Sequence, residues 1–219
     1  MRLAATVILV RDASAGIDVL LLRRSGRSPF APDAFVFPGG GVDEGDRAAV
    51  PAGWDSKRIA AEFRAVAPPE LPPSEPPPSY GDATALVGAA VRELREEASI
   101  TIDAASLHLF SHWITPPDEP RRYNTYFFIA RAPAGQLGAA DRHETHDEIW
   151  IAPGEALARG ERGEMHLVYP TIKHLERLTS AASVDAVLDF ARSKPIVTIM
   201  PDRAPSAGFV MPRSLEGRW

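Results

Sequence analysis

The sequence predicts an α/β protein of the α+β kind, an α/β/α sandwich in which a mixed central sheet lies between helices. Three observations support this class. The chain begins with two apolar, β-branched segments separated by a turn, a long amphipathic helix follows, and strand-like segments then give way to helices. A hydrophobic content of 45% in 219 residues is ample for one core, so we treat residues 1–219 as a single domain.

The first two predicted strands, residues 3–10 and 17–24, are separated by Asp12-Ala13-Ser14-Ala15-Gly16, a pattern typical of a hairpin. A short strand at residues 34–37 leads into the glycine-rich segment Pro38-Gly39-Gly40-Gly41. Glycine has no Cβ, so this segment can turn sharply and bring its backbone close to a ligand.

Residues 47–82 are predicted to be an insertion. Residues 55–66 have a helical pattern that places Ile59, Phe63 and Val66 on one side. Residues 68–80 hold seven prolines, which exclude a helix or a central strand. We expect a Pro-rich arm extended over the surface, and a disordered loop is the alternative.

The second half of the chain is predicted to contain both strands and helices. A helix from about residue 83 to residue 98 is followed by strands at 106–115, 123–130 and 147–151. Helices are expected at 153–159, 170–182 and 184–193, and a last strand at 195–200 precedes an irregular tail. Residues 183–219 form a C-terminal extension to the predicted core.

Charge and composition limit the partners. The net charge of −5 provides no global basic field for nucleic acid. No apolar run reaches the ~18 residues that a membrane span needs, so no membrane partner is expected. The chain has no cysteine, which agrees with a cytoplasmic protein and excludes disulfides and thiolate metal sites.

Three carboxylates gather on one face of the helix that ends near residue 98. At 100° per residue, Glu93, Glu96 and Glu97 span roughly a quarter of the helix circumference. They repel one another unless a cation neutralises them, and oxygen ligands of this kind suit Mg²⁺ or Mn²⁺. The alternative is an acidic helix face exposed to water.

Together with the glycine-rich segment, this helix resembles the Nudix hydrolase signature, G-x5-E-x7-R-E-U-x-E-E-x-G-U, in which U is aliphatic. The residues that match are Gly40, Arg92, Glu93, Leu94, Glu96, Glu97 and Ile100. Three features depart from it: Asp46 replaces the first Glu, Ser99 replaces the last Gly, and residues 47–91 form a spacer of 45 residues instead of seven. Because Ser99 can form the helix-ending left-handed turn only with strain, we expect the following loop to differ.

The chain also resembles the coenzyme A diphosphatase branch of this family, which has a long insertion inside the Nudix signature. The branch pattern L-L-T-x-R-[SA]-x3-R-x3-G-x3-F-P-G-G is matched here by Leu20, Leu21, Arg24, Ser25, Phe37, Pro38, Gly39 and Gly40. Leu22, Pro29 and Asp33 do not match, and Arg27 lies two residues before the position of the second Arg.

The resemblance implies roles for individual residues. Metal ligands would be Glu93, Glu96, Glu97 and the carbonyl of Gly39. Arg92 would orient these carboxylates. The expected catalytic residues are Glu97, Glu144 and Arg92. Glu144 is the expected general base because it stands six residues before Trp150, and Glu148 and Asp147 are the alternatives.

Substrate contacts are expected from a second set of residues. Arg24 and Arg27 at a strand end could hold phosphates in bidentate fashion, or be ordinary surface charges. Gly40 would approach the substrate, and Arg122 and Tyr123 precede a strand that should face the cleft. Tyr123 could stack on adenine or simply pack in the core.

The resemblance implies a Mg²⁺- or Mn²⁺-dependent hydrolase that cleaves the diphosphate of a nucleoside diphosphate linked to another group. The leading substrate is coenzyme A or an acyl-coenzyme A, giving 3′,5′-ADP and (acyl-)4′-phosphopantetheine. Alternatives are another dinucleotide or a sugar nucleotide, a nucleotide-binding regulator without catalysis, and, last, an interaction protein that uses its Pro-rich arm. The family resemblance is the sole ground for expecting a homodimer.

Overall fold

The structure, a computed structural model, describes residues 1–26, 31–48, 50–64, 66–67, 79–136, 138–140, 145–204, 208–217 and 219. Its strands are β1 (Arg2–Ala13), β2 (Gly16–Arg24), β3 (Phe35–Val36), β4 (Gly39–Gly41), β5 (Val66–Ala67), β6 (His108–Ile114), β7 (Tyr123–Arg131), β8 (Thr145–Ile151), β9 (Ile196–Ile199), β10 (Asp202–Ala204) and β11 (Gly208–Val210). Its helices are α1 (Glu44–Ala48), α2 (Ser56–Arg64), α3 (Tyr80–Ala98), α4 (Pro153–Glu161), α5 (Tyr169–Leu178) and α6 (Val184–Ser193), with 3₁₀ turns η1 (Ala104–Ser106) and η2 (Arg213–Leu215).

Strand β1 organises a mixed sheet with the order β3-β2-β1-β7-β6-β9-β5, in which β4 pairs with β1 and β8 with β2. The second half of β1 forms the predicted hairpin with β2, and Val10 faces Val19. The first half pairs antiparallel with β4, while β7 runs parallel along the opposite edge of β1. The apolar run of β1 is buried on both faces, as expected of a central strand that has a parallel neighbour.

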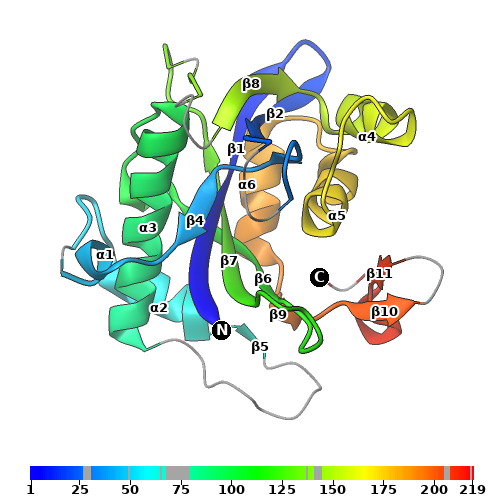
Figure 1. The fold of residues 1–219 in the computed structure, drawn as a ribbon. Coiled ribbons are helices and arrows are strands. Elements are labelled where there is room, and N and C mark those ends of the chain that lie inside the picture. The colour runs from blue at the N-terminus through cyan, green and yellow to red at the C-terminus, as the bar shows by residue number, and fades with distance from the viewer. Residues whose placement is uncertain are drawn as a thin grey trace.

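Helices cover both faces of this sheet, so the predicted α/β/α sandwich is confirmed (Figure 1). Alternate residues of β1 divide between two cores. Ala5, Val7 and Leu9 pack on the side of α2 and α3. Ile8 and Val10 pack on the side of α4, α5 and α6. No helix among the described residues is long and apolar enough to cross a membrane.

Most predicted elements occur close to their expected bounds, and α6 agrees to the residue. Two predictions were wrong at their ends. The helix expected at 170–182 stops at Leu178, whose carbonyl accepts the Ala181 N–H at 3.1 Å in a turn. The helix expected at 55–66 stops at Arg64, because Val66 enters β5 and pairs in parallel with Ile196 of β9.

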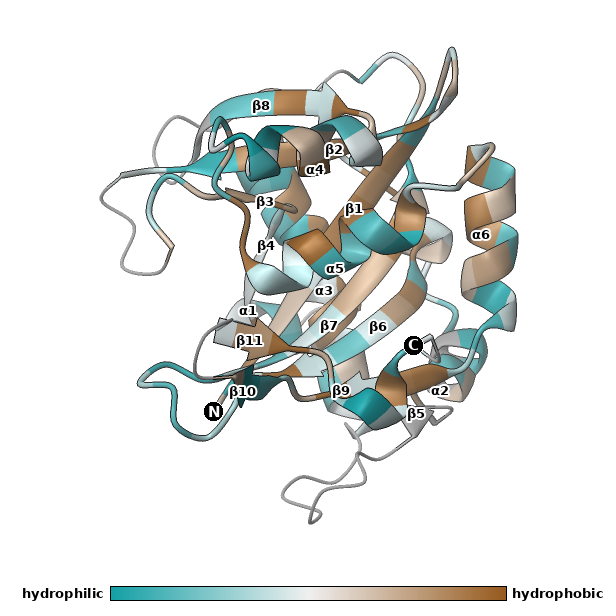
Figure 2. Cartoon of the chain, turned by 90° about the vertical axis from the view of Figure 1, so that its right-hand side faces the viewer, coloured by the Kyte–Doolittle hydropathy of each residue, from teal (hydrophilic) through white to brown (hydrophobic). Residues whose placement is uncertain are grey.

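The tail after residue 200 is more regular than the sequence suggested. Strands β10 and β11 form an antiparallel hairpin in which Arg203 faces Phe209. Figure 2 shows β10 as hydrophilic and β11 as hydrophobic. The Arg203 guanidinium forms ion pairs with Asp118 and Glu119, which tie the hairpin to the loop that connects β6 to β7.

Part of the predicted insertion is integrated into the fold. Phe63 of α2 is buried, and its ring lies 5.1 Å from that of Tyr126 in the core. At the other end, Ser79 caps α3 by accepting the Asp82 N–H, while the Asp82 carboxylate accepts the Ser79 N–H. Asp82 also pairs with Arg47 at 2.6 Å, which lowers the pKa of Asp82. The proline-rich residues 68–78 lie outside the described residues.

The C-terminal end of α3 keeps the left-handed turn despite the serine. Ser99 has φ 56° and ψ 27°, and its N–H donates to the Arg95 carbonyl at 3.0 Å. The Ile100 N–H donates to the Leu94 carbonyl at 3.3 Å, which closes the turn. Serine therefore forms the left-handed turn here, and the expected strain is present, because a Cβ disfavours this conformation.

We expect Ser99→Gly to raise the free energy of unfolding by about 0.5–1 kcal/mol. Glycine removes the left-handed penalty, and its greater freedom in the unfolded chain offsets part of the gain. Chemical denaturation of the two proteins measures the difference. Ser99→Ala is the matched control and should change stability little, because alanine keeps the Cβ. A glycine variant less stable than wild type would contradict the argument.

Candidate active site

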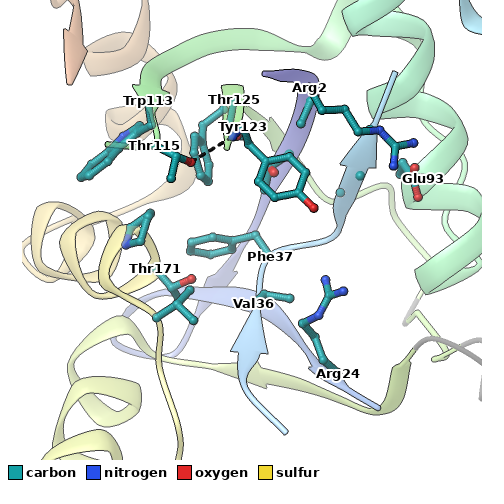
Figure 3. Close-up of a pocket in the computed structure, with 18 of the residues that line it drawn as sticks. Arg2, Arg24, Val36, Phe37, Glu93, Trp113, Thr115, Tyr123, Thr125 and Thr171 are labelled. Carbon is teal, nitrogen blue, oxygen red and sulfur yellow. Dashed lines mark hydrogen bonds between the residues drawn. The ribbon is translucent and has the colours of Figure 1, made fainter. Parts of the chain in front are cut away.

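A cavity of about 850 Å³ opens where α3 meets the first residues of β1 and β4. The carboxylate face of α3 and the three glycines of β4 line one end of it. The floor is formed by β1, β6 and β7, and the other end reaches the start of α5 and the C-terminal hairpin. Figure 3 shows charged side chains from several elements turned toward this space.

The three predicted carboxylates of α3 all line the cavity. Because they occupy positions i, i+3 and i+4, one helical face carries them together. They differ in exposure: the side chain of Glu96 is 49% exposed and that of Glu93 13%, whereas Glu97 is buried. The face therefore runs from solvent at Glu96 inward to Glu97.

The glycines of β4 allow the backbone to meet these carboxylates. The Gly39 N–H donates to Glu97 Oε2 at 2.9 Å. A Cβ on Gly40 would lie 2.1 Å from Glu93 Oε1, and one on Gly39 would lie 2.4 Å from the Ala5 carbonyl oxygen. Side chains at either position would push β4 away from α3 or from β1.

Arg92 links the two halves of the sequence motif. Its Nε and Nη2 donate to the two oxygens of Asp46 at 3.0 and 2.9 Å. Its Nη1 donates to Glu93 at 2.9 Å and to Glu96 at 3.0 Å. These bonds raise the pKa of Arg92 further above its ordinary value, and the bond with Asp46 has the largest effect. The 45-residue spacer leaves the two halves side by side, and the shorter Asp46 side chain reaches Arg92 in bidentate fashion.

The donor set suits a hard divalent cation. Within the described residues, no three His, Cys, Asp or Glu side chains already converge as a ready metal cluster. Glu97 is bonded to Gly39, and Arg92 bonds one oxygen each of Glu93 and Glu96. The residues nevertheless fit a divalent cation, because all donors are oxygens and the glycine backbone of β4 approaches the carboxylates closely.

The predicted substrate residues divide into three groups. Arg24, Gly40 and Tyr123 line the cavity, and Figure 3 shows Arg24 and Tyr123 directed into it. Arg122 does not line the cavity, and its Nε donates to the Thr115 carbonyl at 3.1 Å. Arg27 lies outside the described residues.

The three candidates for a general base have different surroundings. Glu144 lies outside the described residues, but the next residue, Thr145, is buried and donates its hydroxyl to the Glu97 carbonyl at 3.3 Å. Glu148 accepts the Ala140 N–H at 2.9 Å, and Asp147 lies 3.6 Å from Arg23. Neither Glu148 nor Asp147 lines the cavity.

Sequence reasoning missed several residues that line the cavity. Arg2 enters it from the start of β1 and pairs with Asp43 at 3.1 Å. Thr6 and Thr125 form part of the floor. The alternation of side chains along a strand could have predicted Thr125, because it lies two residues after Tyr123 and so points to the same face of the sheet. The same alternation links Thr6 to Arg2.

Comparisons with known proteins agree with this architecture. No protein-family model matches the chain. Its sequence is 28% identical over 215 residues to a Caenorhabditis elegans protein named "Putative nudix hydrolase 7", covering 91% of this chain and 68% of that protein. Its structure is similar to a NUDIX hydrolase from Alicyclobacillus acidocaldarius, with a TM-score of 0.64, 23% identity and coverage of 86% and 96%. The NUDIX domain of Shewanella oneidensis NrtR, solved with ADP ribose, has a TM-score of 0.52 at 16% identity, covering 81% and 85%.

The mixed sheet between two helical layers is therefore the Nudix fold. The sequence relative bears the name of a Nudix hydrolase, and the signature residues matched in the sequence lie together on α3 of this fold.

Proposed function

We propose that the chain is a divalent-cation-dependent hydrolase that cleaves the diphosphate of a nucleoside diphosphate linked to another group. The observation that carries the proposal is the meeting of Glu93, Glu96 and Glu97 with the glycines of β4 at one end of a large cavity. Arg2 and Arg24 line the same space. Carboxylates that collect cations, with arginines nearby, form a site for a strongly anionic substrate.

Each residue of this site has a proposed part. Glu93, Glu96, Glu97 and the Gly39 carbonyl would hold Mg²⁺ or Mn²⁺, which supplies charge neutralisation and acidifies water when bound. Arg92 orients Glu93 and Glu96 through the bonds described above. Water adds to one phosphorus, the P–O bond of the bridging oxygen breaks, and a carboxylate takes the proton of the water.

Glu144 is the carboxylate that we propose as this base. Its position six residues before Trp150, the spacing described above, supports the assignment. We expect Glu144→Gln to lower kcat with little change in KM, as removal of a proton acceptor does. Glu148→Gln is the control and should have the milder effect, since Glu148 bonds Ala140 instead. Steady-state kinetics measures both variants, and a larger loss of kcat in Glu148→Gln than in Glu144→Gln would exclude Glu144 as the base.

Coenzyme A or an acyl-coenzyme A is the substrate that we propose within this class. The match of Leu20, Leu21, Arg24 and Ser25 to the coenzyme A pattern supports it. A cavity of about 850 Å³ is also large enough, because ligand sites commonly enclose ~300–1,000 Å³. Arg24, and with it Arg27, would bind the 3′-phosphate, since a guanidinium meets phosphate oxygens in pairs.

Substrate comparison tests this assignment. With Mg²⁺, coenzyme A should give 3′,5′-ADP and 4′-phosphopantetheine, identified by mass spectrometry. Dephospho-coenzyme A, which lacks the 3′-phosphate, should have a lower kcat/KM, and Arg24→Ala should shrink this preference about tenfold. Arg23→Ala is the matched control, because Arg23 pairs with Asp33 and does not line the cavity. ADP ribose represents the sugar-nucleotide alternative. If the enzyme cleaved ADP ribose rapidly and did not cleave coenzyme A, the coenzyme A branch would be excluded, and the proposed diphosphate hydrolysis would still stand.

A further inference from the structure

A second cavity, of about 260 Å³, lies where helices α2 and α6 approach the start of strand β6. Figure 2 shows the end of α6 directly above α2. In the described part of the chain, this cavity shares no lining residue with the candidate active site. His108 lines the second cavity and Trp113 the first, so about five residues of extended strand, roughly 17 Å, separate the two. The proposed hydrolysis gives the second cavity no role.

The wall of the second cavity is positively charged, although the whole chain carries a net charge of −5. Among the described residues that line it, three cations, Arg58, Arg192 and Lys194, outnumber one carboxylate, Glu62. Glu62 is already bound within the wall: one oxygen accepts from Arg58 Nη1 at 3.2 Å, and the other accepts a backbone N–H of β6 at 2.9 Å. Two positive charges of the wall therefore have no carboxylate to balance them there. A concave wall with one sign of charge attracts a ligand of the opposite sign.

The histidine of this wall, His108, lies between two guanidinium groups. Arg58 Nη1 is 3.0 Å from its Nδ1, and Arg192 Nη2 is 3.4 Å from its Nε2. Both guanidinium groups can only donate, whereas a neutral imidazole has a single acceptor nitrogen. When Nδ1 accepts from Arg58, the Nε2–H of His108 and an Nη2–H of Arg192 are two donors side by side. One oxygen atom of an anion would accept from both donors.

The ammonium of Lys194 adds a third donor group to this wall. Its Nζ is buried and has no hydrogen-bond partner among the described residues. The Phe110 ring, with its centre 4.8 Å away, provides a cation–π contact only. Burial and the nearby Arg177 lower the pKa of Lys194 to about 7, because both disfavour the charged form. An anion in the cavity would offset this cost by its opposite charge.

We propose that the second cavity binds a phosphate group, either as the free ion or as the monoester of a small molecule. Phosphate brings several acceptor oxygens to the donors of His108, Arg192 and Lys194. The volume of about 260 Å³ is below the ~300–1,000 Å³ of common ligand sites, which favours a small anion over a nucleotide. Asp189 pairs with Arg192 at 2.9 Å, but its side chain is 77% exposed, so water weakens this competing pair. The site is independent of the proposed function, because binding here needs neither a divalent cation nor cleavage.

Phosphorus-31 NMR titrations in EDTA, at constant ionic strength, measure the binding of inorganic phosphate and of glycerol 3-phosphate. Wild type should bind inorganic phosphate, and Arg192→Ala should weaken this binding about tenfold, as the loss of one charge-assisted hydrogen bond does. Arg159→Ala is the matched control, because Arg159 also pairs with an acid of its own helix, in the last turn, and lines neither cavity. Binding of glycerol 3-phosphate as well would assign the site to phosphomonoesters, whereas binding of inorganic phosphate alone would assign it to the free ion.

Lys194→Met provides a second test, with effects of opposite sign. Methionine removes the buried ammonium and keeps an apolar chain of similar length, so without phosphate its Tm should be at least that of wild type. Added phosphate should raise the Tm of this variant less than that of wild type. Loss of phosphate binding in Arg24→Ala instead of Arg192→Ala would place the ion in the candidate active site and overturn the inference. An equal rise of Tm in sodium chloride of the same ionic strength would overturn it too, as would unchanged affinity in both Arg192→Ala and Lys194→Met.

Discussion

Glu97→Gln is expected to lower turnover at least about 100-fold while the fold stays intact. Glu97 is the most buried of the three carboxylates, and its Oε2 accepts the Gly39 N–H. The glutamine amide oxygen can accept the same bond, so β4 should stay in place. The variant loses the negative charge that binds a cation, and Mn²⁺ affinity should fall together with kcat.

Two measurements check this result. Phosphate release reports turnover, and Mn²⁺ titration followed by electron paramagnetic resonance reports the affinity. Arg95→Ala is the control on the same helix turn, because the Arg95 side chain is 63% exposed and does not line the cavity. Near-normal turnover of Glu97→Gln with unchanged Mn²⁺ affinity would refute the assignment of Glu97 as a ligand.

Arg92→Ala is expected to lower the free energy of unfolding by about 3 kcal/mol and to abolish activity. The side chain of Asp46 is only 4% exposed, and both its oxygens accept from Arg92. Removing one partner of such a pair leaves a buried charge without compensation, which costs about 3–5 kcal/mol in a fully buried site. The 22% exposure of Arg92 places the loss at the lower end. Glu93 and Glu96 also lose their shared donor, so their repulsion adds to the effect.

A double-mutant cycle isolates the Asp46 part of this loss. Asp46→Asn removes the buried charge, so adding it to Arg92→Ala should recover about 1 kcal/mol or more. Urea unfolding of the four proteins gives the coupling free energy. Arg92→Lys is informative as well, because one ammonium cannot replace the fork that reaches Asp46, Glu93 and Glu96 together. Full stability of Arg92→Ala would show that the pair has no structural role.

Sequence could predict the centre of the fold and the carboxylate face, because both depend on short-range patterns. Val87, Leu94 and Ala98 recur at helical spacing and are buried, which turned the three glutamates toward the other side of α3. The contact between Asp46 and Arg92 has no periodic signal. Only the family motif linked these residues across the spacer.

The elements that sequence did not predict are very short or depend on distant partners. β5 has two residues and exists because Val66 meets Ile196 of β9, far along the chain. Each strand of the C-terminal hairpin has three residues, too few to display an alternating pattern. The hydrogen bond from Arg122 to the Thr115 carbonyl could not be predicted either, because it depends on the turn between the strands.

The ion pair between Arg47 and Asp82 suggests a practical use for the segment that it encloses. Asp82 accepts from both Arg47 and Ser79, which holds the start of α3, and the pairing of β5 with β9 holds the chain just before residue 68. For a segment whose ends are already held, each doubling of length costs only about 0.6 kcal/mol of closure entropy. A protease site or a fluorescent reporter placed between residues 68 and 78 should therefore cost little stability.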